Sequence, residues 1–153
     1  MLNSVALPLF FLALPPAVLA DVTIGGARPT TLHVPASYDP EVPAPLVFLL
    51  HGCPSNAAAM EGWLKFLPLA DQFGFLYAAP DGLPWSSANA WTCGDAAAEN
   101  SAYLRGLLEE AQGLFRVYRD RICIAGYSDG GFMAYRMACD HAEVLTAVAS
   151  GAG

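Results

Sequence analysis

The chain has 153 residues, of which 55% are hydrophobic and 14% charged, and its formal net charge is −7. This acidity argues against nucleic acid as a partner, because binding to phosphates relies on clustered Lys and Arg side chains. A chain of this length most often forms one domain, and its apolar content is sufficient for a hydrophobic core.

The first 20 residues have the outline of a secretory signal peptide. Val5–Leu14 is an apolar run, Pro15–Pro16 interrupts it, and small residues precede a cleavage position after Ala20. The alternative is an uncleaved anchor, but the run is too short to span a bilayer comfortably. We therefore expect a mature chain of residues 21–153 that is secreted to the extracellular space and has no membrane contact after cleavage.

Strands are predicted early in the mature chain. Val22–Ile24 and Thr31–Val34 predict two short strands joined through Gly25–Gly26. After a proline-rich loop, Leu46–Leu50 is a continuous apolar run of strand length. Such a run is typical of a strand that is buried on both faces of a parallel sheet.

The middle of the chain combines helix and strand. Residues 56–73 predict helix, and we expect Gly62 and Pro68 to interrupt it. Phe75–Ala79 predicts the next strand, and Pro80–Gly82 predicts the turn that ends it.

The second half continues the alternation. Residues 104–115 carry one apolar stripe at helical spacing. Arg121–Ala125 predicts a buried strand, Gly131–Ala138 a helix and Leu145–Ala149 a last strand. Strands alternating with helices predict right-handed crossovers and an α/β fold with a mostly parallel sheet.

The most informative motif is Gly126-Tyr127-Ser128-Asp129-Gly130. It fits a G-x-S-x-G nucleophile elbow, in which a serine sits on a sharp turn between a strand and a helix. Gly126 and Gly130 remove side chains that would collide at this turn. The flanking strand and helix supply the expected context, so we predict that Ser128 is a catalytic nucleophile rather than an ordinary serine in a glycine-rich turn.

A second motif, His51-Gly52-Cys53, directly follows the buried run Leu46–Leu50. In α/β-hydrolases the loop at this position supplies one backbone N–H of the oxyanion hole, and the residue after the nucleophile supplies the other. The predicted donors are therefore the backbone N–H groups of Cys53 and Asp129. The alternative is a strand end with a turn glycine.

A serine nucleophile requires a histidine base, and none of the three histidines is well placed. His33 lies in an early strand, His141 lies near the end of the helix that follows Ser128, and His51 is expected to shape the oxyanion loop. A metal site built from His51, Cys53 and Cys93 matches no ligand spacing with a known geometry, so we expect no metal.

Cysteine and aromatic residues leave alternatives open. In an oxidising compartment Cys53 and Cys93, both in loops after predicted strands, are the favoured disulfide pair. Cys123 and Cys139 either form a bridge or remain packed thiols. Three aromatic residues either line a substrate cleft or pack within loops, namely Trp85, Trp91 and Tyr103.

Several ordered motifs together resemble the secreted esterase family of polyhydroxybutyrate depolymerases, which also includes feruloyl and acetyl-xylan esterases. The segments that carry this resemblance are Pro45–Cys53, Gly62–Trp63, Leu69–Phe75, Pro80–Gly82 and Arg121–Tyr135. The resemblance implies an α/β-hydrolase three-layer sandwich, an extracellular location, and carboxylic-ester hydrolysis by a Ser-His-Asp triad without a cofactor. The implied substrates are polymeric or small aryl and acyl esters.

In that family the triad aspartate and histidine follow further strands, whereas this chain ends at Gly153. We therefore expect the chain to be the N-terminal part of a single α/β-hydrolase domain, truncated before the C-terminal strands, with doubtful activity by itself. A rival hypothesis is a non-catalytic secreted module that binds polymer or glycan through the Trp85–Trp91 loop. A third is a peptidase or thioesterase of the same fold.

Overall fold

The computed structural model describes residues 20–85, 88–92 and 96–153. The main sheet contains β1 (Val22–Ile24), β2 (Thr30–His33), β3 (Ala44–Leu50), β4 (Leu76–Ala78), β7 (Val117–Tyr127) and β8 (Ala147–Gly151). The helices are α1 (Ala57–Leu64), α2 (Phe66–Phe73), α3 (Ala96–Leu114) and α4 (Asp129–Asp140). A separate two-stranded sheet pairs β5 (Leu83–Trp85) with β6 (Ala88–Ala90), in a segment where the sequence shows no regular period.

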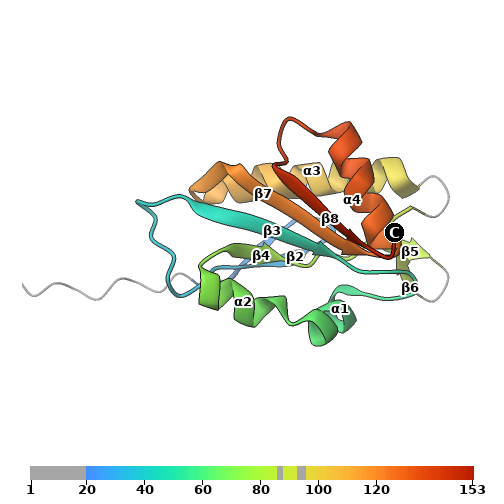
Figure 1. Ribbon diagram of the computed structural model, residues 1–153, viewed down its shortest axis with the longest axis horizontal. Coiled ribbons are helices and arrows are strands. Elements are labelled where there is room, and N and C mark those ends of the chain that lie inside the picture. Colours follow the sequence, from blue (N-terminus) through green and yellow to red (C-terminus); the bar gives the residue numbers. More distant parts are fainter. Residues whose placement is uncertain (1–19, 86–87, 93–95) are drawn as a thin grey trace, which may run out of the picture.

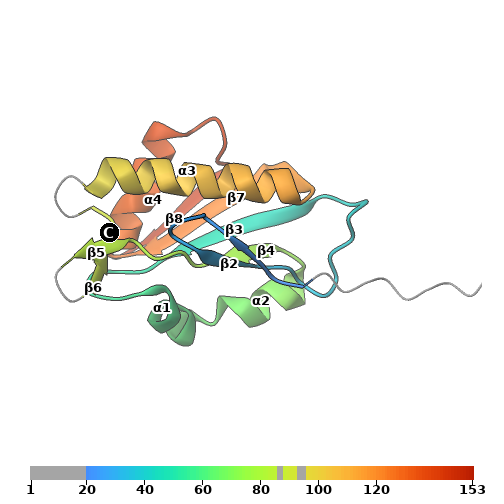
Figure 2. The same ribbon diagram turned by 180° about the vertical axis from the view of Figure 1, so that it is seen from behind.

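The described residues form three layers, with α1 and α2 on one face of the sheet and α3 and α4 on the other (Figures 1 and 2). The six strands follow the order β1-β2-β4-β3-β7-β8. β1, β2 and β4 pair antiparallel, whereas β4, β3, β7 and β8 run parallel. The predicted α/β fold with a mostly parallel sheet is confirmed.

The register of the two central strands brings the two predicted motifs together. β3 and β7 pair in parallel, with Leu50 opposite Gly126. Because parallel strands end at the same edge of a sheet, the loop after Leu50 and the turn after Gly126 leave the sheet side by side. This places His51–Cys53 next to Ser128.

Strand β3 supplies the core on both faces of the sheet, because neighbouring side chains in a strand point to opposite faces. Leu46, Phe48 and Leu50 are buried in the cluster that includes the apolar face of α3 and α4. Leu49 packs on the other side with Met60 of α1. The continuous apolar run of the sequence is therefore a strand buried on both faces.

The interruption of residues 56–73 lies at Lys65, not at Gly62 or Pro68, so the predicted break positions were wrong. Lys65 has a left-handed backbone, φ 54° and ψ 53°, and separates α1 from α2. Gly62 remains within α1 with open space around it. Pro68 lies in the first turn of α2, where a backbone N–H has no partner within the helix, so proline is tolerated there.

Glu61 caps the start of α2, and its replacement by alanine is expected to lower the free energy of unfolding by ~2 kcal/mol. Its carboxylate accepts hydrogen bonds from the Phe66 and Leu67 amides and, at 2.6 Å, from the Tyr77 hydroxyl. Burial and this hydrogen bond raise the pKa of the Tyr77 phenol above its ordinary value. Urea unfolding measures the change.

Glu109→Ala is the control for this variant, because the contact that the described residues show for Glu109 is an exposed ion pair with Arg105. Its loss is expected to change the free energy of unfolding by no more than ~0.5 kcal/mol. Equal effects of the two variants would contradict the capping role of Glu61.

The apolar stripe that the sequence predicts for residues 104–115 lies on α3 up to Leu114. The predicted stripe is buried at Leu104, Leu107, Leu108 and Ala111, whereas Leu114 is 57% exposed.

Cys123 in β7 and Cys139 in α4 are free thiols, so they do not form the bridge that was one of two alternatives. Cys93 lies outside the described residues, and its pairing with Cys53 stays a prediction.

Among the helices of the described residues, none has both the length and the apolar character needed to cross a bilayer.

Candidate active site

Ser128 lies at the sharp turn between β7 and α4. Its backbone has φ 52° and ψ −117°, a conformation that is strained for a residue with a side chain. The Ser128 amide donates to the Gly151 carbonyl at 2.8 Å, and the Ser128 carbonyl accepts from the amides of Gly131 and Phe132. The neighbouring strand and the first turn of α4 therefore hold the serine in this conformation.

The two motif glycines allow the backbone segments at this turn to approach closely. A Cβ atom on Gly126 would lie 2.1 Å from the carbonyl oxygen of Gly130. A Cβ atom on Gly130 would lie 2.4 Å from the carbonyl oxygen of Leu50, at the end of β3. Both obstacles are backbone atoms, so side chains cannot move aside to make room.

Replacement of Ser128 by glycine is expected to raise the free energy of unfolding by about 1 kcal/mol relative to Ser128→Ala. Glycine adopts a positive φ without strain, although its greater freedom in the unfolded chain offsets part of this gain. Chemical denaturation of the two variants measures the difference. Equal stabilities would contradict a strained elbow.

The loop after β3 lies against the elbow. Gly52 is so close that a Cβ atom on it would lie 3.4 Å from Ser128 Cβ. Cys53 and Ser128 both line a pocket of about 200 Å³. The structure therefore brings together the loop and the serine that the sequence predicts as parts of one site. Asp129, the residue predicted to carry the second oxyanion donor, is the first residue of α4.

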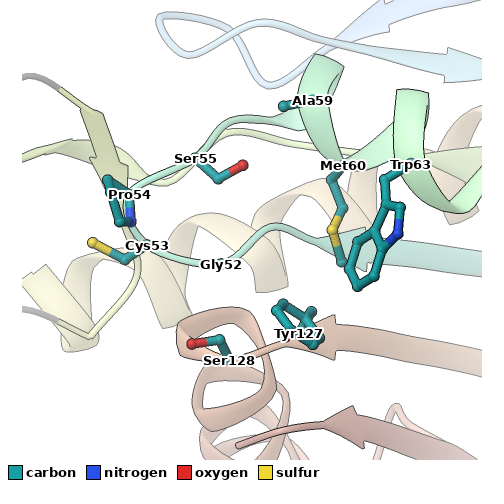
Figure 3. Close-up of a pocket in the computed structure, with 9 residues that line it drawn as sticks. All are labelled: Gly52, Cys53, Pro54, Ser55, Ala59, Met60, Trp63, Tyr127 and Ser128. Carbon is teal, nitrogen blue, oxygen red and sulfur yellow. The ribbon is translucent and has the colours of Figure 1, made fainter.

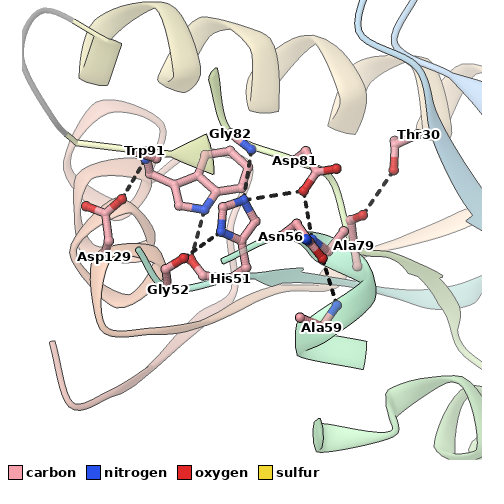
Figure 4. A network of polar contacts seen from close by, with 12 residues as sticks. Thr30, His51, Gly52, Asn56, Ala59, Ala79, Asp81, Gly82, Trp91 and Asp129 are labelled. Atoms are coloured by element: carbon pink, nitrogen blue, oxygen red, sulfur yellow. Dashed lines mark hydrogen bonds and ion pairs between the residues drawn. The ribbon is translucent and has the colours of Figure 1, made fainter. Parts of the chain in front are cut away.

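His51 is fully buried, and its hydrogen bonds determine its tautomer (Figure 4). The Gly82 amide donates to His51 Nε2 at 3.1 Å, so Nε2 carries no proton. Nδ1 therefore donates to the Gly52 carbonyl, at 2.7 Å. Nε2 also lies 3.5 Å from Asp81 Oδ1, but a ring that accepts the Gly82 N–H is neutral and forms no ion pair there.

The other two histidines also contact groups other than Ser128. His33 lies between Asp21 and Asp71, with its two ring nitrogens 2.9 and 3.0 Å from their carboxylates. His141 Nε2 lies 3.2 Å from the hydroxyl of Ser101. In the part of the chain that the structure describes, each imidazole is thus engaged by a group other than Ser128.

The pocket beside Ser128 has an aromatic side. Trp63 and Tyr127 contact each other edge to face, with ring centroids 5.0 Å apart. Met60 and Trp63 lie across the pocket from Cys53, and Tyr127 lies beside Ser128 (Figure 3). Trp63 is 59% exposed, so part of this aromatic surface faces solvent. The sequence did not assign Met60 or Trp63 to the site, because both lie on α1, outside the two motifs from which the site was predicted.

Asp129 has a side-chain contact that the sequence does not reveal. Its buried carboxylate accepts the Trp91 amide at 2.6 Å and the Thr92 hydroxyl. Trp91 itself is fully buried, and its indole N–H donates to the His51 carbonyl at 3.0 Å (Figure 4). Trp91 therefore packs inside the protein and does not line a cleft, which answers the alternative left open for this residue.

Tyr103 lies at a different hollow, lined with it by Arg28 and Asp81. Its hydroxyl donates to the Arg28 carbonyl at 2.8 Å, and the Arg28 guanidinium lies 3.8 Å from the centre of its ring. Burial raises the pKa of the Tyr103 phenol. The side chain of Trp85 lies outside the described residues. Tyr103 thus packs on Arg28, away from the pocket beside Ser128.

Other proteins are similar to this chain in sequence or in fold. NocK of Nocardia uniformis subsp. tsuyamanensis, designated an esterase, is 32% identical over 142 residues, which cover 86% of this chain and 40% of NocK. Feruloyl esterase B of Neurospora crassa is 28% identical over 146 residues, which cover 90% of this chain and 49% of that enzyme. The chain therefore spans less than half the length of either relative.

The fold is similar to that of the acetyl xylan esterase from Aspergillus awamori, with a TM-score of 0.69 and 20% identity. That match covers 84% of this chain and 49% of the solved structure. A family model described as Esterase PHB depolymerase matches residues 31–153, which include the loop after β3 and the turn at Ser128. The chain belongs to this family of ester hydrolases.

Proposed function

We propose that Ser128 is the nucleophile of a carboxylic-ester hydrolase that works through an acyl-enzyme. The observation that carries this proposal is the strained backbone of Ser128 between two glycines at which a Cβ atom would clash with backbone atoms. Strain that persists at one residue is typical of functional sites. The membership in an esterase family supports the same conclusion.

In the proposed reaction Ser128 Oγ attacks the ester carbonyl carbon and loses its proton to a general base. The carbonyl oxygen becomes an oxyanion, which accepts hydrogen bonds from the backbone N–H groups of Cys53 and Asp129. The alcohol then leaves with a proton, and water hydrolyses the acyl-enzyme in a second round of the same chemistry. Removal of a single oxyanion donor in another enzyme costs about 2.7–4 kcal/mol of transition-state stabilisation.

We further propose that the triad histidine and aspartate lie outside these 153 residues. The three imidazoles of the chain are engaged by Asp21 and Asp71, by Gly52 and Gly82, and by Ser101. The greater length of the curated relatives supports this proposal. Loss of the triad histidine costs about 10⁶ in kcat in another serine hydrolase, so the unaided chain should be nearly inactive.

The pocket beside Ser128 favours esters with one aromatic ring on the acyl or alcohol side. Its volume is about 200 Å³, and an apolar cavity of roughly 150 Å³ holds one benzene molecule. The edge-to-face pair of Trp63 and Tyr127 offers a planar partner for such a ring. Within the feruloyl, acetyl-xylan and polyhydroxyalkanoate esters, a feruloyl-type ester fits these features best.

The test is the hydrolysis of 4-nitrophenyl acetate by the purified chain with added imidazole, which can act as the external base. We expect turnover that rises with imidazole, exceeds the rate of imidazole alone, and is lost in Ser128→Ala. The exposed-serine variant Ser37→Ala is the matched control and should behave like the original chain. Undiminished turnover in Ser128→Ala would contradict the assignment of the nucleophile.

Export from the cell is also part of the proposal. Residues 1–20 have the pattern of a signal peptide, and Asp21, the residue that follows them, forms hydrogen bonds within the fold. The Asp21 carboxylate accepts the Val34 amide at 3.0 Å, so the expected first residue of the mature chain is tied to the sheet. N-terminal sequencing of the exported protein tests this, and a start other than Asp21 would contradict it.

A further inference from the structure

Trp91 contacts both segments that carry the proposed oxyanion donors. It follows β6 directly and is fully buried. Its backbone N–H donates to Asp129 Oδ2 at 2.6 Å, while its indole N–H donates to the His51 carbonyl at 3.0 Å. Figure 4 shows the indole between the two segments. One buried residue, through its backbone N–H and its indole N–H, therefore connects the elbow to the proposed oxyanion loop.

On the loop side, the contact continues to the peptide that holds one donor. His51 packs against the indole, with ring centroids 5.2 Å apart, and its Nδ1–H donates to the Gly52 carbonyl. The Gly52–Cys53 peptide is trans, so its N–H points opposite to its carbonyl. With the carbonyl turned toward His51, the Cys53 N–H is directed away from the His51 ring.

On the elbow side, the contact reaches the residue that holds the other donor. Asp129 is the first residue of α4, and its carboxylate also accepts a hydrogen bond from the Thr92 hydroxyl. The Trp91 segment is fixed in turn by Asn100 of α3, a buried side chain whose amide donates to the carbonyls of Ala90 and Trp91 at 3.1 and 2.9 Å. Trp91 is thus hydrogen-bonded to three separate segments, at Asp129, His51 and Asn100.

We propose that Trp91 is a positioning residue that sets the separation and direction of the Cys53 and Asp129 N–H groups. This inference rests on the proposed function, because it concerns the same oxyanion hole. Donors must lie about 2.7–3.1 Å from the developing oxyanion to act on it. A displacement of 1 Å can cost about 10²-fold in rate, so a bridge between the two donor segments has a direct chemical consequence.

The test compares Trp91→Phe, which keeps a buried ring but loses the indole N–H, with Tyr103→Phe. The control also loses one hydrogen bond from an aromatic side chain to a backbone carbonyl, at a site away from the elbow. The probe is phenylboronic acid. Ser128 Oγ forms a bond to boron, its proton passes to the buffer, and the tetrahedral boronate places an oxygen at the oxyanion position.

Boronate affinity is expected to fall about tenfold or more in Trp91→Phe, because weakened donor placement acts on the tetrahedral adduct. It should stay within about twofold in Tyr103→Phe, and Ser128→Ala should abolish it. Thermal unfolding shows that each variant is folded. If Trp91→Phe does not fold, Asp129→Asn is measured instead, because it weakens the hydrogen bond between the Trp91 amide and residue 129. Unchanged affinity in the folded variant overturns the proposal.

A second measurement separates this inference from the proposed function. If the original chain does not bind the boronate through Ser128, the nucleophile assignment is wrong, and the ¹H–¹⁵N signals of Cys53 and Asp129 decide the positioning role. We expect both signals to shift in Trp91→Phe and to stay in place in Tyr103→Phe. Unshifted signals in Trp91→Phe overturn the role of Trp91, whatever the boronate result.

Discussion

Replacement of Gly126 or Gly130 by alanine is expected to lower the free energy of unfolding by at least ~3 kcal/mol. The added methyl group would lie 2.1 Å from a carbonyl oxygen in the first case and 2.4 Å in the second. Both contacts are with backbone, so relief requires that β7, α4 or the end of β3 moves. The same movement would displace Ser128.

Gly106→Ala is the matched control, because Gly106 lies within α3 and an added Cβ would meet nothing within 4 Å. Alanine there is expected to raise the free energy of unfolding by about 0.5–1 kcal/mol, through its better helix propensity. Urea denaturation of the three variants gives the comparison. If the Gly126 and Gly130 variants unfold at the same urea concentration as the unsubstituted chain, the close packing of the elbow is contradicted.

Replacement of Asp129 by alanine is expected to lower the free energy of unfolding by ~3 kcal/mol. The Trp91 amide and the Thr92 hydroxyl would lose their shared acceptor in a buried place, and hydrogen bonds to a charged group contribute about 1.5–3 kcal/mol each. The start of α4 would also lose a favourable negative charge. Asp129→Asn keeps one acceptor and should show a smaller loss.

Asp140→Ala tests the same substitution at the opposite end of α4. Asp140 is exposed and bonds Arg136 and Ser101. A negative charge is unfavourable at a helix C-terminus, which offsets much of what its partners contribute. We expect a change within about 1 kcal/mol in thermal or urea unfolding. An equal loss at positions 129 and 140 would show that the buried contact with Trp91 contributes little.

The elements that the sequence predicts correctly depend on local patterns. The apolar run Leu46–Leu50 has the length of a strand, and it is β3. The glycine spacing around Ser128 specifies a tight turn, because only glycine permits the contacts that form there. The parallel arrangement follows from the alternation of strands and helices, so the meeting of the loop after β3 with the turn at Ser128 could be expected before the structure was known.

The features that the sequence does not reveal depend on contacts between distant segments. Asp129 is adjacent to Ser128 in sequence, but its carboxylate bonds a segment 38 residues away, at Trp91. Nothing local distinguishes Trp91 from an aromatic residue at a cleft. The helix break at Lys65 is similarly hidden, because Glu61 and Tyr77 stabilise the new helix start from outside the break. The tautomer of His51 depends on the Gly82 amide, which approaches only in the fold.

The strain at Ser128 and the bonds of Asp129 act in opposite directions on stability. The positive φ of Ser128 destabilises the fold, whereas the glycine packing and the buried carboxylate hold the turn in place. A serine that were merely structural would gain nothing from this conformation. In the proposed function, this cost in stability is explained by the placement of the Ser128 hydroxyl at the edge of the sheet, beside the pocket.

The central claim, that Ser128 is a nucleophile, is tested most directly by covalent capture. The purified chain is treated with a fluorophosphonate in the presence of imidazole, and the modified peptide is identified by mass spectrometry. We predict a single phosphonate on Ser128 Oγ, formed faster with imidazole and absent from Ser128→Ala. Modification of other serines in place of Ser128, or equal modification of Ser128→Ala, would contradict the claim.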